Sequence, residues 1–286
     1  MIIYSNLEFK NFNSLHVNNI IKYMFEVENS FEIYTLVYLF NIFNLNYHVI
    51  GNASKVLFKE QYVNTPVIYI NDKFNEFYYM NNKVLVSAGT KLSYLINMLA
   101  KKGYGGFHNL FPIPACVGGA IYMNAGDNIN DIAKFVDKVI CIDKCNNNIV
   151  TFSNDQCNFS YRNSVFKNNN YVILYVLFKY ELIDKNIIYK EIKNAIEYRK
   201  NNQVIKQYTC GSLFKNYDGI KAYKLIDKTI SKNLNVKGAH LSNKHLNFLI
   251  NDGNATSEDM LLLIKSIYDE IQFKYGINLQ LELNII

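Results

Sequence analysis

Glycine and proline are concentrated in one part of this chain, and this concentration limits what the chain can fold into more than any other feature. Residues 103–126 hold six of the 13 glycines and two of the three prolines. Glycine permits left-handed backbone and close approach of the chain to another group, whereas proline fixes the backbone dihedral φ. The segment therefore predicts backbone that turns sharply or lies directly against a partner.

The sequence before this segment alternates between helix and strand patterns. The predicted elements are two helices and three strands, namely helices over residues 30–43 and 92–101 and strands at 47–50, 67–70 and 84–88. The first strand ends on Gly51, which is typical of a turn. The order of helix, strand and glycine turn favours a mixed α/β fold.

The sequence after the segment is first strand-rich and then more polar. Apolar runs predict strands at 139–142 and 171–180, and a polar helix follows over 188–203. We expect a domain change near residue 182, where the strand-rich part ends.

The C-terminal part has the clearest local pattern. Thr256 and Asp259 resemble a helix start, apolar residues follow at helical spacing, and Gly276 is placed to end the helix. Residues 279–285 alternate between apolar and polar types, which predicts a final strand with Glu282 on the face opposite the leucines.

Composition excludes several classes of protein. The length of 286 residues and a hydrophobic content of 50% allow a substantial core and about two domains. The formal charge of +6 comes from 30 Lys+Arg against 24 Asp+Glu, and the cations are spread along the chain. A nucleic-acid-binding protein usually shows clustered cations, so we expect a solvated basic surface and no nucleic-acid partner.

The sequence also predicts a cytoplasmic protein without membrane insertion. Its first residues lack the pattern of an export signal, and the most apolar window, residues 31–43, is shorter than the roughly 20 residues that a membrane span needs. Five cysteines, an odd number, fit reduced thiols better than a disulfide framework.

Residues 113–126 carry the sharpest motif, Ile-Pro-Ala-Cys-Val-Gly-Gly-Ala-Ile-Tyr-Met-Asn-Ala-Gly. Successive small residues expose backbone N–H groups that can bind an anion, and a flat ring can lie against such a chain. The motif therefore indicates a phosphate or cofactor loop, with a tight turn in a packed sheet as the alternative. It resembles the signature of the UDP-N-acetylenolpyruvoylglucosamine reductase family, in which the corresponding segment lies beside the flavin.

Further blocks resemble the same family in the same order. Three of its blocks are matched by residues 161–164 (Tyr-Arg-Asn-Ser), 211–216 (Gly-Ser-Leu-Phe-Lys-Asn) and 238–251. Glu282 stands where the family has a glutamate in its last strand. Taken singly, Ser212 is typical of a turn, Arg162 of an ion pair and Glu282 of an outward strand position. Their occurrence together and in order favours the resemblance.

The resemblance implies an α+β (mixed α/β) fold. It consists of a two-part FAD-binding domain of the UDP-N-acetylmuramate dehydrogenase and vanillyl-alcohol-oxidase-like type, followed by a C-terminal α+β substrate domain. The expected domains are residues 1–60 and 61–182 for the two FAD-binding subdomains and 183–286 for the substrate domain. No Gly-x-Gly-x-x-Gly motif follows a strand, so we expect no separate Rossmann domain.

The activity implied is reduction of UDP-N-acetylglucosamine enolpyruvate to UDP-N-acetylmuramate, with non-covalent FAD as cofactor and NADPH as co-substrate. Ser212 is implied as the proton donor, Arg162 as the group that stabilises the enolate, and Glu282 as a partner that holds or assists it. Substrate contacts are implied for Tyr161, Lys215 and Asn216. Cofactor contacts are implied for the small residues of two loops, Gly51, Asn52, Ala53, Ser54, Gly118, Gly119, Ala120, Asn124, Ala125 and Gly126.

No metal site is expected, because His240 and His245 lack a metal-ligand pattern. The first flavin loop departs from the family, which has a glycine-rich loop ending Gly-Ser-Asn where this chain has Gly51-Asn52-Ala53-Ser54-Lys55. Side chains there crowd the expected pyrophosphate contacts, although Lys55 offers an additional charge contact. Two alternatives therefore remain: a flavin oxidoreductase with another substrate, and an FAD-free UDP-sugar-binding protein. The sequence leaves the oligomeric state open, with a monomer favoured.

Overall fold

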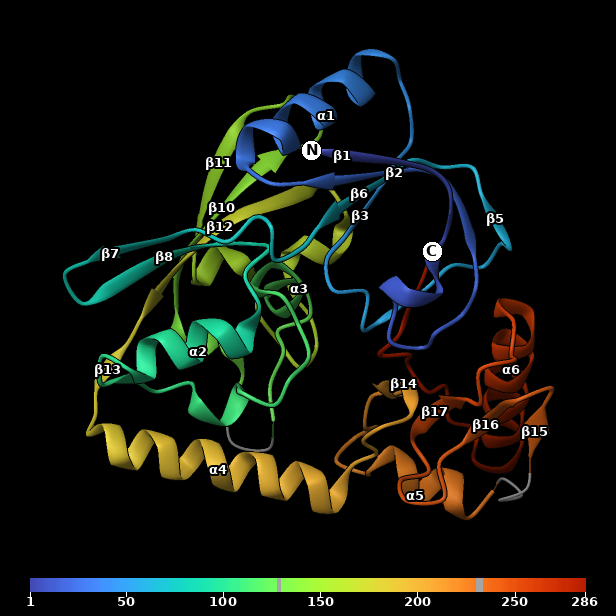
Figure 1. Cartoon of the computed structure of the whole chain (residues 1–286). Coiled ribbons are helices and arrows are strands. Elements are labelled where there is room, and N and C mark those ends of the chain that lie inside the picture. Colours follow the sequence, from blue (N-terminus) through green and yellow to red (C-terminus); the bar gives the residue numbers. More distant parts are fainter. Residues whose placement is uncertain (128–129, 230–233) are drawn as a thin grey trace. The chain divides into compact units, whose positions relative to one another are not determined.

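The computed structural model describes residues 1–127, 130–229 and 234–286 (Figure 1). Contacts divide the chain into two compact units. Unit 1 comprises residues 1–4, 23–52 and 65–198, and unit 2 comprises residues 5–22, 53–64 and 199–286. The domain boundaries predicted at residues 60 and 182 divide the chain into continuous segments, whereas each unit is made of three separate segments. These boundaries stay a prediction.

Unit 1 contains a small sheet with parallel neighbours. β6 (Val67–Ile70) lies between β2 (Ile20–Val27) and β3 (His48–Ile50), and both pairings are parallel. All four residues of β6 are buried, as expected for a continuous apolar run in the middle of a parallel sheet. β1 (Ile2–Glu8) neighbours β2 in the same sheet. Helix α1 (Ser30–Ile42) links β2 to β3, and the Asn29 side chain caps its start.

A second sheet in unit 1 is antiparallel. Its order is β11 (Ile149–Ser153), β10 (Val136–Asp143), β12 (Tyr171–Lys179), β8 (Lys83–Ser87) and β7 (Phe77–Met80). Helices α2 (Leu92–Ala100) and α3 (Val117–Tyr122) contribute buried side chains to the same core as these strands. The central strand β12 is long and apolar because it is covered along most of its length.

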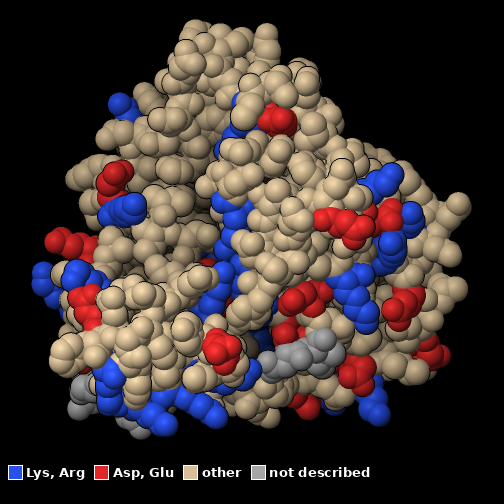
Figure 2. All heavy atoms as spheres, turned by 180° about the vertical axis from the view of Figure 1, so that it is seen from behind, with Lys and Arg blue, Asp and Glu red and all other residues tan. Residues whose placement is uncertain are grey.

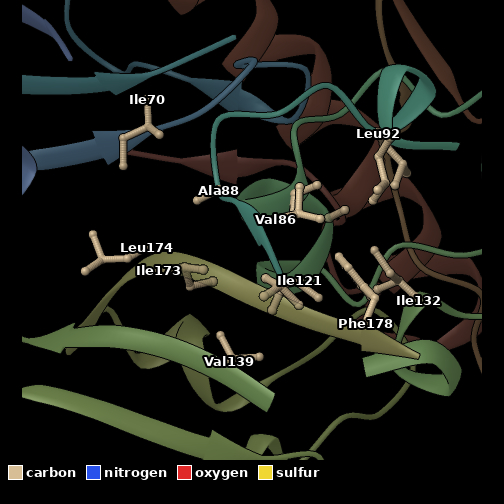
Figure 3. Close-up of a cluster of buried hydrophobic side chains, with 14 of the residues drawn as sticks. Ile70, Val86, Ala88, Leu92, Ile121, Ile132, Val139, Ile173, Leu174 and Phe178 are labelled. Carbon is tan, nitrogen blue, oxygen red and sulfur yellow. The ribbon is translucent and has the colours of Figure 1, made fainter. Parts of the chain in front are cut away.

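One continuous core joins these elements, and Figure 3 shows a part of it. Val86 from β8, Ile121 from α3, Val139 from β10 and Phe178 from β12 lie close together there, and all four are fully buried. Burial of each such side chain contributes roughly 1.5–3 kcal/mol. This packing fixes α3, the helix that carries the Gly-Gly-Ala part of the motif, against the sheet.

Shorter elements complete unit 1. A two-stranded ladder pairs β9 (Tyr104–Gly105) with β13 (Glu181–Leu182). Helix α4 (Lys185–Asn202) follows, and it is polar with few buried residues. The short 3-10 turns of this unit are His108–Leu110, Ile132–Phe135, Asp155–Cys157 and Val165–Asn168.

Unit 2 is built on an antiparallel sheet with the order β14 (Tyr208–Ser212), β17 (Phe248–Asn251), β16 (Ala239–Leu241) and β15 (Asn235–Val236). Helices α5 (Ala222–Asp227) and α6 (Ser257–Tyr275) share its core. β5 (Tyr62–Val63) pairs with the start of β2, β4 (Val56–Leu57) pairs in parallel with β18 (Asn284–Ile285), and a 3-10 turn spans Phe9–Phe12.

The predicted helices and the inner strands are confirmed to within a few residues, and α6 agrees best. Thr256 and Asp259 form a capping box at its start, and Gly276 ends it in left-handed backbone with a φ of 67°. The mixed α+β fold class is confirmed as well.

The predicted final strand is wrong over most of its length. Only residues 284–285 form a strand, and the chain bends at Glu282 and Leu283. Glu282 is buried together with Leu279 and Leu283, so the expected outward face does not exist. The reason is irregular pairing with another segment: Lys215 donates its N–H to the Gln280 carbonyl, and Glu282 donates to the Leu213 carbonyl.

Within the described ranges, the helices are all too short or too polar to cross a membrane. On the face shown in Figure 2, basic side chains form a column down the middle of the view and a row along its lower left edge, and acidic side chains lie beside the basic ones mainly at the two sides.

Candidate functional site

A pocket in unit 1 lies where the first predicted flavin loop meets the start of α3. Gly51 and Asn52 follow β3 directly, and the Asn52 side-chain amide donates to the Pro114 carbonyl at 2.9 Å. This bond ties the loop to the glycine- and proline-rich segment. The residues that line the pocket come from both parts and from the ends of neighbouring strands: Asn52, Tyr69, Asn71, Asp72, Gly89, Lys91 and Cys116.

Two of the glycines beside this pocket are required by close packing, and a third leaves space open. A Cβ atom on Gly51 would lie 2.2 Å from the Cys116 sulfur, and one on Gly118 would lie 2.9 Å from the Ala88 Cβ. At Gly119, among the residues that the structure describes, such an atom would have only the Cys116 sulfur within 4 Å, at 3.4 Å. Gly119 therefore leaves open the space that a side chain would fill.

The backbone N–H groups of α3 are already paired. Gly118 donates to the Ala88 carbonyl at 2.8 Å, Ala120 donates to the Cys116 carbonyl at 2.9 Å, and Gly119 donates to the Cys116 sulfur at 3.4 Å. A ligand can therefore lie close to the backbone of this segment, but the polar groups that would bind it come from side chains. The amides of Asn52 and Asn71 and the ammonium of Lys91 are donors that suit a diphosphate. Each also has a partner in the chain: the Asn52 amide donates to the Pro114 carbonyl, the Asn71 amide donates to the Glu26 carboxylate, and Lys91 is paired with Asp72.

Ala53 and Ser54 complete the first loop. Ala53 is buried and has a φ of 44°, a left-handed conformation that costs a non-glycine residue roughly 1–2 kcal/mol. This is the position where the resemblance places a glycine, so the alanine here is accompanied by backbone strain.

The residues at the end of the 113–126 motif hold one another in place. Asn124 is buried with a φ of 42°, and its side chain donates to the Ser160 carbonyl at 2.9 Å and accepts from the Ala133 N–H at 3.2 Å. Ala125 is also buried. A Cβ atom on Gly126 would lie 1.8 Å from the Asp131 carboxylate, so a glycine is needed to admit that carboxylate.

Arg162 lies against this same segment. Its guanidinium donates to the Gly126 carbonyl at 2.6 Å and to the Asp131 carboxylate at 3.1 Å, and it lies over the Tyr161 ring. Arg162 has a φ of 53° in a two-residue turn, a strain of a kind that clusters at functional sites. Ser164 adds a bond from its hydroxyl to the Tyr122 carbonyl at 2.8 Å. The structure thus brings the 161–164 block and the 113–126 motif together.

Ser212 and Glu282 are brought together in unit 2. Gly211, with a φ of 73°, shifts the pairing of β14 with β17, which produces an extra residue just before Ser212. Such bulges often redirect a side chain at a functional site. Glu282 donates its N–H to the Leu213 carbonyl at 2.8 Å, and Lys55 contacts both segments.

The two predicted substrate residues that follow β14 have local partners. The Lys215 ammonium donates to the Gln280 side-chain oxygen at 3.4 Å, and the Asn216 side-chain oxygen accepts from the Ala222 N–H at 3.1 Å at the start of α5. Tyr161 is exposed on the surface of unit 1.

Several polar residues of these surroundings were not predicted: Asp131 as the partner of Arg162, and Tyr69, Asn71, Asp72 and Lys91 at the pocket. Asp131 and Lys91 belong to no recognisable motif. Asn71 follows a buried strand, which is a weak signal for a site at a sheet edge.

Comparison with known proteins gives a consistent result over the whole chain. Residues 203–286 match the family model described as "UDP-N-acetylenolpyruvoylglucosamine reductase, C-terminal domain", and residues 21–153 match the one described as "FAD binding domain". The chain is 34% identical to the UDP-N-acetylenolpyruvoylglucosamine reductase of Clostridium tetani over 85% of this chain and 78% of that protein. It is 32% identical to that of Clostridium novyi over 99% of this chain and 92% of that protein.

A solved structure agrees with these relatives. The crystal structure of UDP-N-acetylenolpyruvylglucosamine reductase from Thermus caldophilus is similar with a TM-score of 0.82 and 27% identity. The match covers 99% of this chain and 98% of that one.

Proposed function

The chain belongs to the UDP-N-acetylenolpyruvoylglucosamine reductase family, and from this we propose that it reduces UDP-N-acetylglucosamine enolpyruvate to UDP-N-acetylmuramate for peptidoglycan precursor synthesis. The family consists of FAD-dependent oxidoreductases that use NADPH as reductant. The observation that carries the proposal is the match of residues 203–286 to the C-terminal domain of this reductase, because FAD-binding domains also occur with other substrates. That domain contains both Ser212 and Glu282.

FAD fits the residues that are present. We propose that Gly51, Asn52, Gly118 and Gly119 lie against it, with the Asn71 amide and the Lys91 ammonium near its diphosphate. When bound, FAD would supply the hydride-transfer chemistry between NADPH and the substrate. The polar side chains and the open face of Gly119 support non-covalent binding. Ala53, Ser54, Ala120, Asn124, Ala125 and Gly126 complete the proposed cofactor residues.

The chain's own residues would stabilise the developing negative charge and donate the proton. Reduction of the enolpyruvyl double bond places a hydride on one carbon and a proton on its neighbour, and negative charge develops toward the carboxylate. We assign stabilisation of that charge to the Arg162 guanidinium, which the Asp131 carboxylate and the Gly126 carbonyl already orient. The Ser212 hydroxyl would donate the proton, and Glu282 would assist it. Removing one such preorganised donor typically costs about 3–4 kcal/mol of barrier.

Substrate contacts are proposed for Tyr161, Lys215 and Asn216, with the Lys215 ammonium suited to phosphate or carboxylate oxygen. We further propose a cytoplasmic monomer with subdomains at residues 1–60 and 61–182 and a substrate domain at 183–286. We also propose small-molecule partners and no nucleic acid, because the cations are spread along the whole sequence.

Separate measurement of the two half-reactions tests the proposal. In the Ser212→Ala variant, NADPH should reduce the flavin at the normal rate, seen as bleaching of its absorption, because flavin reduction needs no proton at the sugar's carbon. Its reoxidation by the enolpyruvyl sugar nucleotide should slow by about 10²-fold or more, as for the loss of a general acid. Arg162→Lys should slow the same half-reaction, because the planar two-donor group is lost.

The outcomes separate the alternatives. An impaired NADPH half-reaction in Ser212→Ala, or two unchanged rates, would make Ser212 structural. A purified protein without a flavin absorption band would favour the FAD-free binding protein. Flavin that is reduced by NADPH but not reoxidised by the enolpyruvyl sugar nucleotide would favour another substrate.

A further inference from the structure

Lys55 contacts both of the segments that carry Ser212 and Glu282. Its ammonium donates to the Ser212 carbonyl and lies 3.6 Å from the Glu282 carboxylate. All three residues belong to unit 2. Lys55 is 157 positions away from Ser212 in the sequence, so this contact exists only in the folded chain.

The backbone of Lys55 is fixed to the segment that carries Glu282. The Lys55 carbonyl accepts two hydrogen bonds from Asn284, at 2.9 Å from its backbone N–H and at 3.1 Å from its side-chain amide. The parallel pairing of Val56 with Asn284 continues this connection. The root of the Lys55 side chain is therefore held two residues from Glu282, and only its side chain has to be ordered to reach the carboxylate.

The ion pair is largely withdrawn from solvent. The side chain of Lys55 is 21% exposed and that of Glu282 is 11% exposed, so water and salt screen their attraction less than in a surface pair. The ammonium lies between two groups that only accept hydrogen bonds, a carboxylate and a carbonyl. Without a cation these two groups would repel each other, and the carboxylate would be more stable if it turned toward water.

We propose that Lys55 is a positioning residue for the reduction, whose ammonium keeps the Glu282 carboxylate next to the backbone of Ser212. The proposal rests on the roles assigned above to Ser212 and Glu282. It replaces the expectation from sequence that Lys55 serves as a charge contact for the flavin diphosphate. If Lys55 contacted the diphosphate, its loss would weaken FAD binding. If Lys55 positions Glu282, its loss leaves FAD binding unchanged.

The test uses FAD-loaded protein and four variants. Lys55→Met removes the charge and keeps most of the side-chain length, whereas Lys55→Arg keeps the charge. Glu282→Gln and the double variant Lys55→Met/Glu282→Gln measure the energetic coupling between the two residues. Lys265→Met is the matched control, because Lys265 forms an exposed i,i+4 pair with Asp269 in the same unit. Each variant is measured in both half-reactions by stopped flow, and its FAD dissociation constant is measured by titration.

We expect Lys55→Met to slow reoxidation by the enolpyruvyl sugar nucleotide by about 10- to 100-fold, because a displaced carboxylate is a misplaced reacting group. Reduction by NADPH and the FAD dissociation constant should stay as in the parent, and Lys55→Arg should recover most of the lost rate. The double variant should be no slower than Glu282→Gln alone, since the pair is already broken. Lys265→Met should match the parent throughout.

Other results would overturn the proposal. A Lys55→Met variant that weakens FAD binding and slows both half-reactions would return Lys55 to the diphosphate role. Independent, multiplying losses in the double variant would show that Lys55 does not act through Glu282. If Lys55→Met fails to fold, Lys55→Gln, alone and combined with Glu282→Gln, takes its place in the same comparison, with the same expected and contrary results. If Ser212→Ala and Glu282→Gln leave reoxidation unchanged, the roles assigned to Ser212 and Glu282 fail first, whatever Lys55→Met does.

Discussion

Cys210 lies two residues before Ser212 and is the nearest alternative reactive group along the chain. It is buried, and this burial raises the pKa of its thiol to about 11, with the Glu282 carboxylate raising it and the Lys55 ammonium lowering it. Such a thiol is protonated at neutral pH and is therefore a poor nucleophile. The reaction also needs a hydride and a proton, and no covalent intermediate.

We expect Cys210→Ala to keep most of the parent turnover, measured as NADPH oxidation that depends on the enolpyruvyl sugar nucleotide. The small side chain lost from the core should lower the free energy of unfolding by about 1 kcal/mol. Cys116→Ala serves as a comparison, because Cys116 is also buried and its sulfur accepts the Gly119 N–H at the start of α3. A turnover loss in Cys210→Ala as large as that in Ser212→Ala would reassign the proton donor.

At the scale of elements, three strands of the antiparallel sheet share one charged cluster. Lys83 on β8 and Lys179 on β12 are directly opposite each other, an arrangement that by itself is destabilising. Asp137 on the neighbouring strand β10 accepts from both, at 2.6 Å from Lys83 and 3.1 Å from Lys179. The hydrogen bond from Lys83, followed by that from Lys179, lowers the pKa of Asp137 below its ordinary value.

The depressed pKa sets the direction of the pH dependence. Stability from Asp137 is present above the ordinary carboxyl pKa of about 3.9 and is lost as the pH falls through the lower pKa of the folded state. Asp137→Asn should therefore lower the free energy of unfolding by about 1 kcal/mol at neutral pH and have a smaller effect in acid. Urea denaturation across this range measures both, with the exposed Asp155→Asn as control. An equal loss at neutral and acid pH would mean that packing, and not charge, is responsible.

At the scale of the whole molecule, the prediction concerns how the cofactor is held. Cys116, which lines the pocket, and His108, in the same glycine- and proline-rich segment, are the two residues considered for a flavin linkage, and neither has the setting for it. Burial raises the pKa of the Cys116 thiol, and burial lowers the pKa of His108. Acid precipitation should therefore release all the flavin colour into the supernatant, read from its absorption band. Colour that stays in the pellet, even after washing in denaturant, would contradict non-covalent binding.

The amino-acid sequence by itself determined the elements whose signals are local. Helix α6 was predicted with both of its ends, because a capping box and a C-terminal glycine act between residues three or four positions apart. The inner strands β6 and β12 were predicted because their apolar runs follow from burial, complete in β6 and along most of the length of β12. The order of the four sequence blocks indicated the family, which the comparisons confirm.

Only the tertiary structure decided which residues surround the proposed catalytic groups. Glu282 was expected on an outward strand face and is buried, because the segment around it pairs irregularly with residues 213–215. Asp131 beside Arg162 and Lys55 beside Glu282 carry no signal in the sequence. These pairs form between residues brought together by the packing of distant segments, and charge attraction of this kind depends on distance and burial, which no local pattern encodes.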